Sequence, residues 1–326
     1  MEEKILVALF LCTTEASEIL ETLKPGWNSQ VSGSLESKCS MLNLQVADLD
    51  IFPWKHELSD TVDYEMFNRS FLIQPDLYLR VRPGKHKSVK QKLEAAGIEF
   101  SYPADDCIAL PNSVKMDGVV DINSEAVIQD LSSQRTGDLL LKINSGTDNN
   151  NLKVWDCCTA SGGKSIMAID ILGGIDLTVS DIRPGILHNL KKRFAEAGIQ
   201  RYKSFVTDLA RPGLIPIPAD FDLIIADVPC TGSGTWSRTP EQLYYFDEAE
   251  IKRYSELQKS IVANAIPHLK RGGYLLYITC SVFKQENEGT INYVLSNFPF
   301  QLKEMNVIKG YDKKADTMFA ALLQKL

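Results

Sequence analysis

A chain of 326 residues with a formal net charge of −7 is longer than one ordinary domain, so two or three structural units are expected. Its 44% hydrophobic and 24% charged residues are typical of a soluble globular protein, and no apolar run approaches the length of a membrane span. The seven cysteines form no C-x-x-C pair, which argues against a disulfide framework or a zinc site. We therefore expect a cytoplasmic protein without a metal.

The acidity lies in residues 1–70, which hold 5 Lys and Arg against 12 Asp and Glu and leave 30 of each sign for the rest. Affinity for a nucleic acid would then depend on local basic patches rather than on the overall charge. Helical segments are expected at 5–12 and 16–23, with a turn at 24–26. Residues 1–70 are therefore predicted to form a mainly helical N-terminal segment, in which we find no motif with chemistry.

Residues 71–145 change to the pattern of a small α/β unit, with a polar linker following at 144–151. Strands are expected at 77–82, 98–102, 107–110 and 126–130, and helices at 88–96 and 131–143. A basic stretch without acids comprises Arg80, Arg82, Lys85, Lys87, Lys90 and Lys92, together with His86. Such a run is either a solvated face or, beside a catalytic domain for nucleic acid, a patch for the RNA backbone.

Strands and helices alternate regularly through the third unit, residues 146–326. Seven strands are expected, at about 152–156, 177–182, 202–206, 221–228, 273–279, 300–307 and 317–323. The main helices are expected from about 164, from Pro184 to Gly198, at 247–269 and at 285–297. This alternation predicts an α/β fold with a largely parallel sheet that is covered on both faces. Ligands then bind at the carboxyl ends of the strands.

The first strand of this unit runs into a loop of small residues that ends at Gly162 and Gly163. A Walker loop would need a glycine where Cys158 stands, and a dinucleotide fingerprint would need three spaced glycines instead of an adjacent pair. Both phosphate motifs are therefore excluded. A glycine loop that lets a ligand approach the backbone remains, and S-adenosylmethionine, a nucleoside without phosphate, fits that description.

Polar residues follow each of the first five strands of this sheet. They are Asp156, Asp181, Asp208, Asp227 and Cys280. Each could singly be a helix cap or a turn residue, but five in phase predict a ligand site at one edge of the sheet. Asp181 is placed to accept both ribose hydroxyls of a nucleoside, and Asp208 to meet the adenine amino group.

Two cysteines stand just after adjacent strands, so that both thiols could face one cleft. Cys230 lies in Asp227-Val228-Pro229-Cys230-Thr231-Gly232-Ser233-Gly234-Thr235, and Cys280 lies in Thr279-Cys280-Ser281. Most cysteines are buried and inert, which we expect of Cys12, Cys39, Cys107 and Cys157. Cys158 is either a small filler of the glycine loop or a backbone contact to a cofactor.

These motifs together resemble the Sun/Fmu family of RNA cytosine 5-methyltransferases over residues 75–326. The resemblance rests on Asp156, Ala160 to Lys164, Asp181, the Cys230 and Cys280 segments, Glu286-Asn287-Glu288, and Ile128 to Gln134. It implies a Rossmann-like methyltransferase fold, preceded by the small α/β unit as an RNA-binding-type subdomain. Two departures are Ser161, where the family usually has proline, and an N-terminal region shorter than the family's helical RNA-binding domain.

The resemblance also assigns roles to residues. Cys280 would be the nucleophile that adds to carbon 6 of cytosine, and Asp227 would hold the N3 and amino edge of the ring. Cys230 would assist removal of the carbon 5 proton or release of Cys280, and Lys164 would contact Asp227 or the target nucleotide. S-adenosylmethionine would be bound by Cys158, Thr159, Ala160, Ser161, Gly162, Gly163, Lys164, Asp181, Asp208 and Asp227.

RNA is the expected partner, with ribosomal RNA placed before transfer RNA by the resemblance to bacterial Sun/Fmu proteins. A methyltransferase for small molecules or proteins on the same fold would depend on neither cysteine. A catalytically silent RNA-binding assembly factor would keep the fold but form no 5-methylcytosine. The presence of Lys164, Asp227, Cys230 and Cys280 favours an active enzyme.

Overall fold

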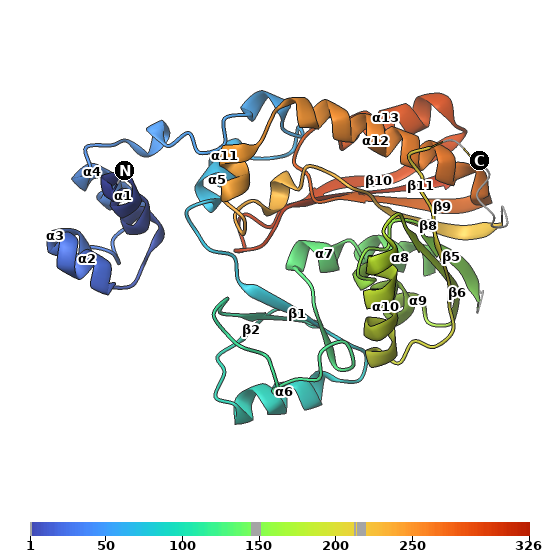
Figure 1. Cartoon of the computed structure of the whole chain (residues 1–326), viewed down its shortest axis with the longest axis horizontal. Helices are drawn as coiled ribbons and strands as arrows, with labels where there is room; N and C mark the ends of the chain where they lie inside the picture. Colours follow the sequence, from blue (N-terminus) through green and yellow to red (C-terminus); the bar gives the residue numbers. More distant parts are fainter. Residues whose placement is uncertain (1, 145–150, 212, 214–219) are drawn as a thin grey trace.

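The computed structural model describes residues 2–144, 151–211, 213 and 220–326. Its N-terminal helices form a lobe of their own, which Figure 1 shows in dark blue beside the rest of the molecule. They are α1 (Glu2–Cys12), α2 (Glu18–Leu23), α3 (Pro25–Asn28) and α4 (Leu35–Met41). Phe10, Leu20 and Val31 form the small core of this lobe. The turn expected at 24–26 is wrong in part, because Pro25 occupies the first position of α3, where a proline needs no N–H partner.

The chain from Val46 to Ser70 leaves this lobe and packs against the main domain. It contains the 3₁₀ turns η1 (Val46–Asp48) and η2 (Lys55–Glu57) and the helix α5 (Tyr64–Ser70). Phe52 and Phe67 of this segment share an apolar cluster with Trp236 and Phe283 of the main domain. The expected mainly helical segment thus contains one part that stands apart and one part that is built into the main domain.

The small α/β unit is an antiparallel four-stranded sheet in the order β2-β3-β1-β4 with α6 (His86–Ala95) packed on it. Its strands are β1 (Leu77–Val81), β2 (Ser101–Ala104), β3 (Cys107–Leu110) and β4 (Ala126–Ile128). The helix expected at 131–143 is divided into α7 (Leu131–Arg135) and α8 (Asp138–Asn144). Gly137 lies at the break, where an added Cβ would be 2.8 Å from Ile171, so glycine allows the chain to approach the neighbouring helix closely.

The main domain contains a seven-stranded sheet in the order β10-β11-β9-β8-β5-β6-β7, in which only β11 runs antiparallel to its neighbours. The strands are β5 (Leu152–Asp156), β6 (Ile175–Asp181), β7 (Lys203–Val206), β8 (Phe221–Asp227), β9 (Leu269–Thr279), β10 (Phe300–Ile308) and β11 (Met318–Lys325). The predicted mostly parallel α/β sheet is therefore confirmed. The expected linker at 144–151 falls largely on residues 145–150, which lie outside the described residues.

Helices cover both faces of this sheet, as Figure 1 shows. One face packs on α8, α9 (Gly163–Leu172) and α10 (Pro184–Glu196), through side chains such as Ile166 and Phe194. The other packs on α12 (Ala249–Ala265) and α13 (Glu288–Asn297), through side chains such as Val262 and Ile291. Burial on both faces explains why the central strands are continuous apolar runs. Among the described helices, none is both long and apolar enough to cross a membrane.

Candidate active site

Two adjoining cavities lie at the carboxyl ends of β5, β6, β8 and β9. We call them cavity A, of about 400 Å³, and cavity B, of about 320 Å³. Both are lined by Cys158, Ala160, Asp227 and Cys280. Because four residues are common to the two walls, the cavities meet at these side chains. A ligand in one cavity would therefore lie beside a ligand in the other.

The glycine loop between β5 and α9 needs its small residues because its backbone is left-handed. Ala160 has a φ of 44° and Gly162 a φ of 81°. A Cβ added to Gly162 would lie 2.5 Å from the Phe194 ring, so any larger residue would displace α10. Of the predicted loop residues, Thr159, Ser161, Gly163 and Lys164 line cavity B only, whereas Gly162 lines neither cavity.

Cavity A has the wall chemistry that a nucleoside requires. Besides Asp227, the carboxylates of Asp181 and Asp208 line it. Its apolar side chains include Ile182, Leu209 and Ile261. Carboxylates can accept hydroxyl and amino hydrogen bonds, and apolar side chains can cover the faces of a base. The residues present therefore fit the adenosyl part of S-adenosylmethionine.

Arg183 holds the Asp181 carboxylate in this structure. Its Nε donates to Asp181 Oδ1 at 2.9 Å, and the Ala160 N–H donates to Oδ2 at 3.0 Å. Burial raises the pKa of Asp181, but these hydrogen bonds and the Arg183 charge outweigh it and lower the pKa below its ordinary value. The carboxylate is thus kept ionised at the end of β6. A ligand hydroxyl would compete with the guanidinium of Arg183, which is largely exposed.

The sulfur atoms of Cys230 and Cys280 lie 3.2 Å apart. The loops that carry them are joined by the Gly234 N–H, which donates to the Cys280 carbonyl oxygen at 2.9 Å. The hydrogen bond to Cys280, together with burial, raises the pKa of the Cys230 thiol well above its ordinary value. Cys230 therefore keeps its proton, and its S–H lies within hydrogen-bond distance of the Cys280 sulfur.

Lys164 brings a positive charge to the point where the cavities meet. Its Nζ lies 3.2 Å from Asp227 Oδ2 and donates to Ser133 Oγ at 2.6 Å. The lysine is buried at the start of α9, and Asp227 is partly exposed at the end of β8. The lysine thus orients the Asp227 carboxylate beside the two thiols.

A buried carboxylate, Glu286, ties the two cysteine loops together. Its Oε1 accepts from the hydroxyls of Thr231 and Ser281, and its Oε2 accepts from the Thr231 N–H at 3.0 Å and Gln258 Nε2 at 2.8 Å. Burial raises the pKa of Glu286, and these hydrogen bonds oppose the rise. Thr231 and Ser281 each follow one of the two cysteines directly. The sequence contained Glu286 in a family motif but gave no signal of this role.

Replacing Glu286 by alanine is expected to lower the free energy of unfolding by roughly 2–4 kcal/mol, because several buried donors lose their acceptor. Any reaction that uses the two thiols should also become slower, because Thr231 and Ser281 would no longer hold the two cysteine loops together. Denaturant unfolding and single-turnover kinetics measure the two effects. Glu99→Ala, which removes an exposed acid of the small α/β unit, is the control and should cost less than about 1 kcal/mol. A loss in the Glu286 variant no larger than the control's would contradict this role.

Asp156 is a buried acid at the end of β5, and one of its two carboxylate oxygens accepts no hydrogen bond from the described residues. Ser165 Oγ donates to its Oδ2 at 2.6 Å, while Oδ1 has no hydrogen-bond partner among the described residues. Burial raises the pKa of Asp156 to about 7; the Ser165 hydrogen bond opposes this rise, and the negative charge of Asp227 adds to it. The unfolded chain loses this proton near pH 4 and the folded chain only near pH 7. Stability contributed by Asp156 is therefore lost as pH rises between these values.

The Asp156→Asn variant is expected to lack this loss, because an amide does not titrate. Between pH 4 and pH 8 its free energy of unfolding should fall by roughly 1–3 kcal/mol less than that of the unchanged protein. Urea unfolding at both pH values measures the difference, with the exposed Asp105→Asn as control. Parallel pH profiles for all three proteins would show that Asp156 does not titrate in this window.

The basic stretch is not a continuous RNA-backbone patch, because its two arginines point inward. Arg80 Nη1 lies 2.6 Å from Asp170 Oδ2, and Arg82 Nη2 lies 2.8 Å from Asp170 Oδ1. The side chains of Arg80 and Asp170 are 5% exposed and that of Arg82 is 14% exposed, and the two ion pairs join the β1 region to α9 of the main domain. Lys92 pairs with Asp121 and Glu125, so mainly Lys85, Lys87 and Lys90 face solvent. In an extended chain, residues two apart point to the same face, so Arg80 and Arg82 both point inward. Counting the charges along the sequence could not show which face is the inner one.

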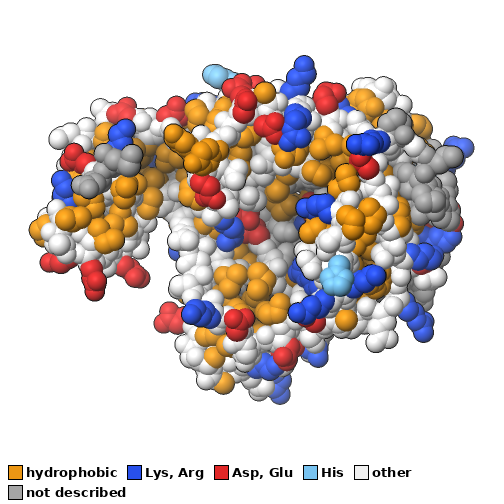
Figure 2. All heavy atoms as spheres, in the orientation of Figure 1, with side chains coloured by type: hydrophobic (Ala, Val, Ile, Leu, Met, Phe, Trp, Pro, Cys, Tyr) orange, Lys and Arg blue, Asp and Glu red, His pale blue; other side chains and the backbone are white. Residues whose placement is uncertain are grey.

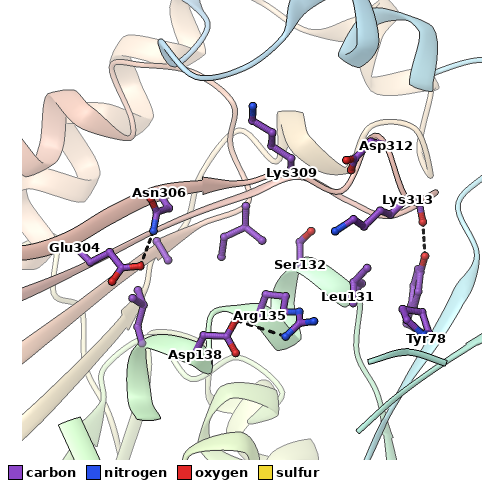
Figure 3. A pocket seen from close by; sticks show the side chains of 14 residues that line it. Tyr78, Leu131, Ser132, Arg135, Asp138, Glu304, Asn306, Lys309, Asp312 and Lys313 are labelled. Atoms are coloured by element: carbon purple, nitrogen blue, oxygen red, sulfur yellow. Dashed lines mark hydrogen bonds and ion pairs between the residues drawn. The ribbon is translucent and has the colours of Figure 1, made fainter. Parts of the chain in front are cut away.

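A larger cavity, of about 680 Å³, lies elsewhere and is lined by neither thiol. Figure 3 shows it between α7, α8, β10 and the turn after β10. Its charges are mixed and partly paired with one another, as in the contact of 3.6 Å between Arg135 and Asp138. Figure 2 shows a hollow between the four-stranded unit and the main domain, with Lys and Arg side chains along its margin. Cavities A and B, which the thiols line, therefore carry the candidate chemistry rather than this larger cavity.

The segment before α5 supports the Cys280 loop from behind. The Ser59 N–H donates to the Val282 carbonyl oxygen at 2.8 Å, and Asn287 Nδ2 donates to Ser59 Oγ at 2.9 Å. Phe52 packs against Phe283 with ring centroids 5.7 Å apart. No motif in residues 1–70 indicated this contact, because it is made by backbone and apolar groups.

The order of the seven strands, together with the loop between β5 and α9, defines a Rossmann-like methyltransferase fold. The solved structure of NSun6 from Pyrococcus horikoshii with SFG superposes with a TM-score of 0.68 at 14% identity, over 80% of this chain and 93% of that one. At this identity the likeness shows the fold alone.

Residues 145–323 match the family described as 16S rRNA methyltransferase RsmB/F, and the chain belongs to this family. The ribosomal RNA small subunit methyltransferase B of Sodalis glossinidius is 28% identical over 237 residues, which are 69% of this chain and 52% of the relative. The human 28S rRNA (cytosine(4447)-C(5))-methyltransferase is 29% identical over 160 residues, 44% of this chain and 18% of that protein. The chain thus spans about half the length of the bacterial relative.

Proposed function

We propose that this protein transfers a methyl group from S-adenosylmethionine to carbon 5 of a cytosine in ribosomal RNA. The observation that carries the proposal is a pair of thiols whose sulfur atoms lie 3.2 Å apart. Cys280 lines both cavities, and Cys230 lines cavity A. A methyltransferase for small molecules or proteins has no use for two adjacent thiols. Family membership and the names of the relatives support RNA as the substrate, with ribosomal RNA as its class.

Cavity A is assigned to the cofactor and cavity B to the cytosine. Asp181 and Asp208 would hold the nucleoside, and Cys158 and Ala160 would form the wall that separates it from the base. S-adenosylmethionine, when bound, supplies an electrophilic methyl group. A base in cavity B must leave its stack, which costs a few kcal/mol and less in single-stranded RNA.

The chemistry of the chain begins at Cys280, whose sulfur forms a bond to carbon 6 of the cytosine. The thiol proton passes through the Asp227 carboxylate to N3 of the ring, so that the adduct carries no net charge. Lys164 stabilises the carboxylate while the proton moves. Carbon 5 then has the electron density of an enamine and accepts the methyl group.

Release reverses the first step. The carbon 5 proton leaves to water, the sulfur–carbon 6 bond breaks with its electron pair returning to Cys280, and the N3 proton returns through Asp227. Cys230 keeps its proton because of its raised pKa, and its S–H donates to the sulfur that becomes negative. Cys230 thus assists the cleavage of the bond between Cys280 and carbon 6 and does not itself attack the cytosine.

Bisulfite sequencing of total RNA from cells with and without the protein tests the proposal. We expect at least one ribosomal cytosine to be protected from conversion only when the protein is present. Mass analysis of the nucleosides should find 5-methylcytosine at the same position. Identical maps in the two cell lines would contradict the proposed function, whereas a lost position in transfer RNA would change the substrate and keep the chemistry.

A further inference from the structure

Arg193 of α10 lines cavity B and has no acid as a partner. Its Nη1 donates to Ser161 Oγ at 2.6 Å and to the Ser161 carbonyl oxygen at 3.2 Å, and its Nε donates to Asn123 Oδ1 at 2.8 Å. All of these acceptors are neutral. Among the described residues, no carboxylate lies within 4.0 Å of its guanidinium, whereas Arg80 contacts one carboxylate and Arg238 contacts two.

The surroundings of Arg193 leave its positive charge uncompensated. Burial lowers the pKa of the guanidinium, and the charge of Arg80 lowers it further, while Glu196 opposes this. The Glu196 carboxylate is itself engaged by Asn123 Nδ2 at 2.9 Å. A half-buried cation beside a second cation is a favourable partner for an anion from outside the chain.

None of the carboxylates that line cavity B neutralises the charge of Arg193. Asp130 and Asp316 are both bound by Arg238, which contacts each at 2.8 Å. Asp227 is engaged by Lys164, and the Asp156 carboxyl is buried with a raised pKa. Arg193 is the guanidinium that lines the cavity with no acid committed to it.

We propose that Arg193 binds a phosphate group of the RNA next to the cytosine that enters cavity B. The inference rests on the proposed function. Asp227 and Cys280 line both cavities, whereas Arg193 lines cavity B only, so cavity B extends from the reacting end toward Arg193. A base at the reacting end directs its sugar and phosphate toward the guanidinium. The planar fork of arginine matches two phosphate oxygens at once.

The Ser161 contact makes Arg193 a positioning residue between the glycine loop and the RNA. An added Cβ on Gly163 would lie 4.0 Å from Arg193 Nη1, so the open backbone of the loop leaves space beside the guanidinium. Phosphate binding would therefore fix the ribose of the target nucleotide against the loop that separates the two cavities. The contact selects for a nucleic acid over a free nucleoside.

The test compares Arg193→Gln with Lys192→Gln, a change of the same charge on the exposed side of the same helix. Binding of a fluorescent single-stranded RNA that contains cytosine is measured by anisotropy at several salt concentrations. We expect Arg193→Gln to weaken binding about tenfold and to reduce the slope of log affinity against log salt by about one, because one phosphate contact is lost. Lys192→Gln should change both less than twofold. Arg193→Lys should restore the slope but only part of the affinity.

Affinity for S-adenosylmethionine is measured on the same variants, and it should change less than twofold in Arg193→Gln. A weaker cofactor affinity with unchanged RNA binding would show that Arg193 only holds Ser161, and would overturn the inference. Equal losses in the Gln variants of Arg193 and Lys192 would also overturn it, because general surface charge would then explain both. The binding assay needs no methyl transfer, so an absence of 5-methylcytosine would contradict the proposed function separately.

Discussion

Replacing Cys280 by alanine is expected to abolish methyl transfer, with a loss of more than about 10³-fold in rate. The proposed chemistry requires a bond between the Cys280 sulfur and carbon 6, and an alanine side chain cannot form it. Cys230 lies 3.2 Å away but keeps its proton, so it does not replace the nucleophile. Transfer of tritium from the labelled methyl group of S-adenosylmethionine to unmethylated ribosomal RNA measures the effect.

The matched control is Cys12→Ala, which removes a thiol in the N-terminal lobe, far along the chain from the two cavities. It should retain full activity. RNA binding should persist in the Cys280 variant, since the phosphate and base contacts do not depend on the thiol. Full methyl transfer by Cys280→Ala would refute the assignment of this residue as the nucleophile.

Replacing Cys230 by alanine is expected to trap the protein on its RNA. The Cys280 sulfur would still add to carbon 6 and carbon 5 would still be methylated, but the S–H donor that stabilises the leaving sulfur would be absent. The adduct should then accumulate as a band of lower mobility on a denaturing gel. Its amount should approach that of the enzyme, because each molecule reacts once.

The Cys230→Ala, Cys280→Ala double variant separates a covalent adduct from tight binding. It should give no such band, because the sulfur assigned as the nucleophile is absent. A band that persists in the double variant would show that the adduct involves another residue. A Cys230 variant that turns over normally would show that the second thiol has no part in release.

The sequence allowed the frame of the site to be predicted because a parallel sheet brings strand ends together. Asp227 and Cys280 end adjacent strands, β8 and β9, and the structure places both in the walls of the two cavities. The glycine loop was recognisable because its left-handed backbone excludes most residues. The spacing of motifs along the chain thus predicted which side chains would be neighbours. The catalytic and binding roles of these residues stay predictions until the variants are measured.

Other parts of the site depend on contacts that no local pattern encodes. Glu286 looks like any acid near a helix start, and only the fold places it between Thr231 and Ser281. The helix predicted from residue 285 begins at Glu288 because the two preceding side chains bond to loops instead. Arg193 looked like one more basic residue of an amphipathic helix, although its neighbours are a loop and a neutral amide.

The contacts of the N-terminal region with the main domain also could not be predicted from the sequence. The sequence predicted a mainly helical segment without a chemical motif. In the structure, the aromatic side chains of Phe52 and Trp54 pack against Trp236 and Phe283, which flank the two thiol loops. Composition averages over a stretch and does not reveal such pairs. The division of the chain at residues 70 and 145 stays a prediction, and the second boundary borders residues outside the described part.

Peptide mapping of a trapped complex tests the central claim most directly. RNA in which the target cytosine carries fluorine at carbon 5 has no proton to release there, so the enzyme should stop as a covalent adduct after methyl transfer. Protease digestion and mass spectrometry then locate the modified residue. The account predicts that the RNA is attached to Cys280. Attachment to Cys230, or the absence of any adduct from an enzyme that methylates the unmodified RNA, would contradict it.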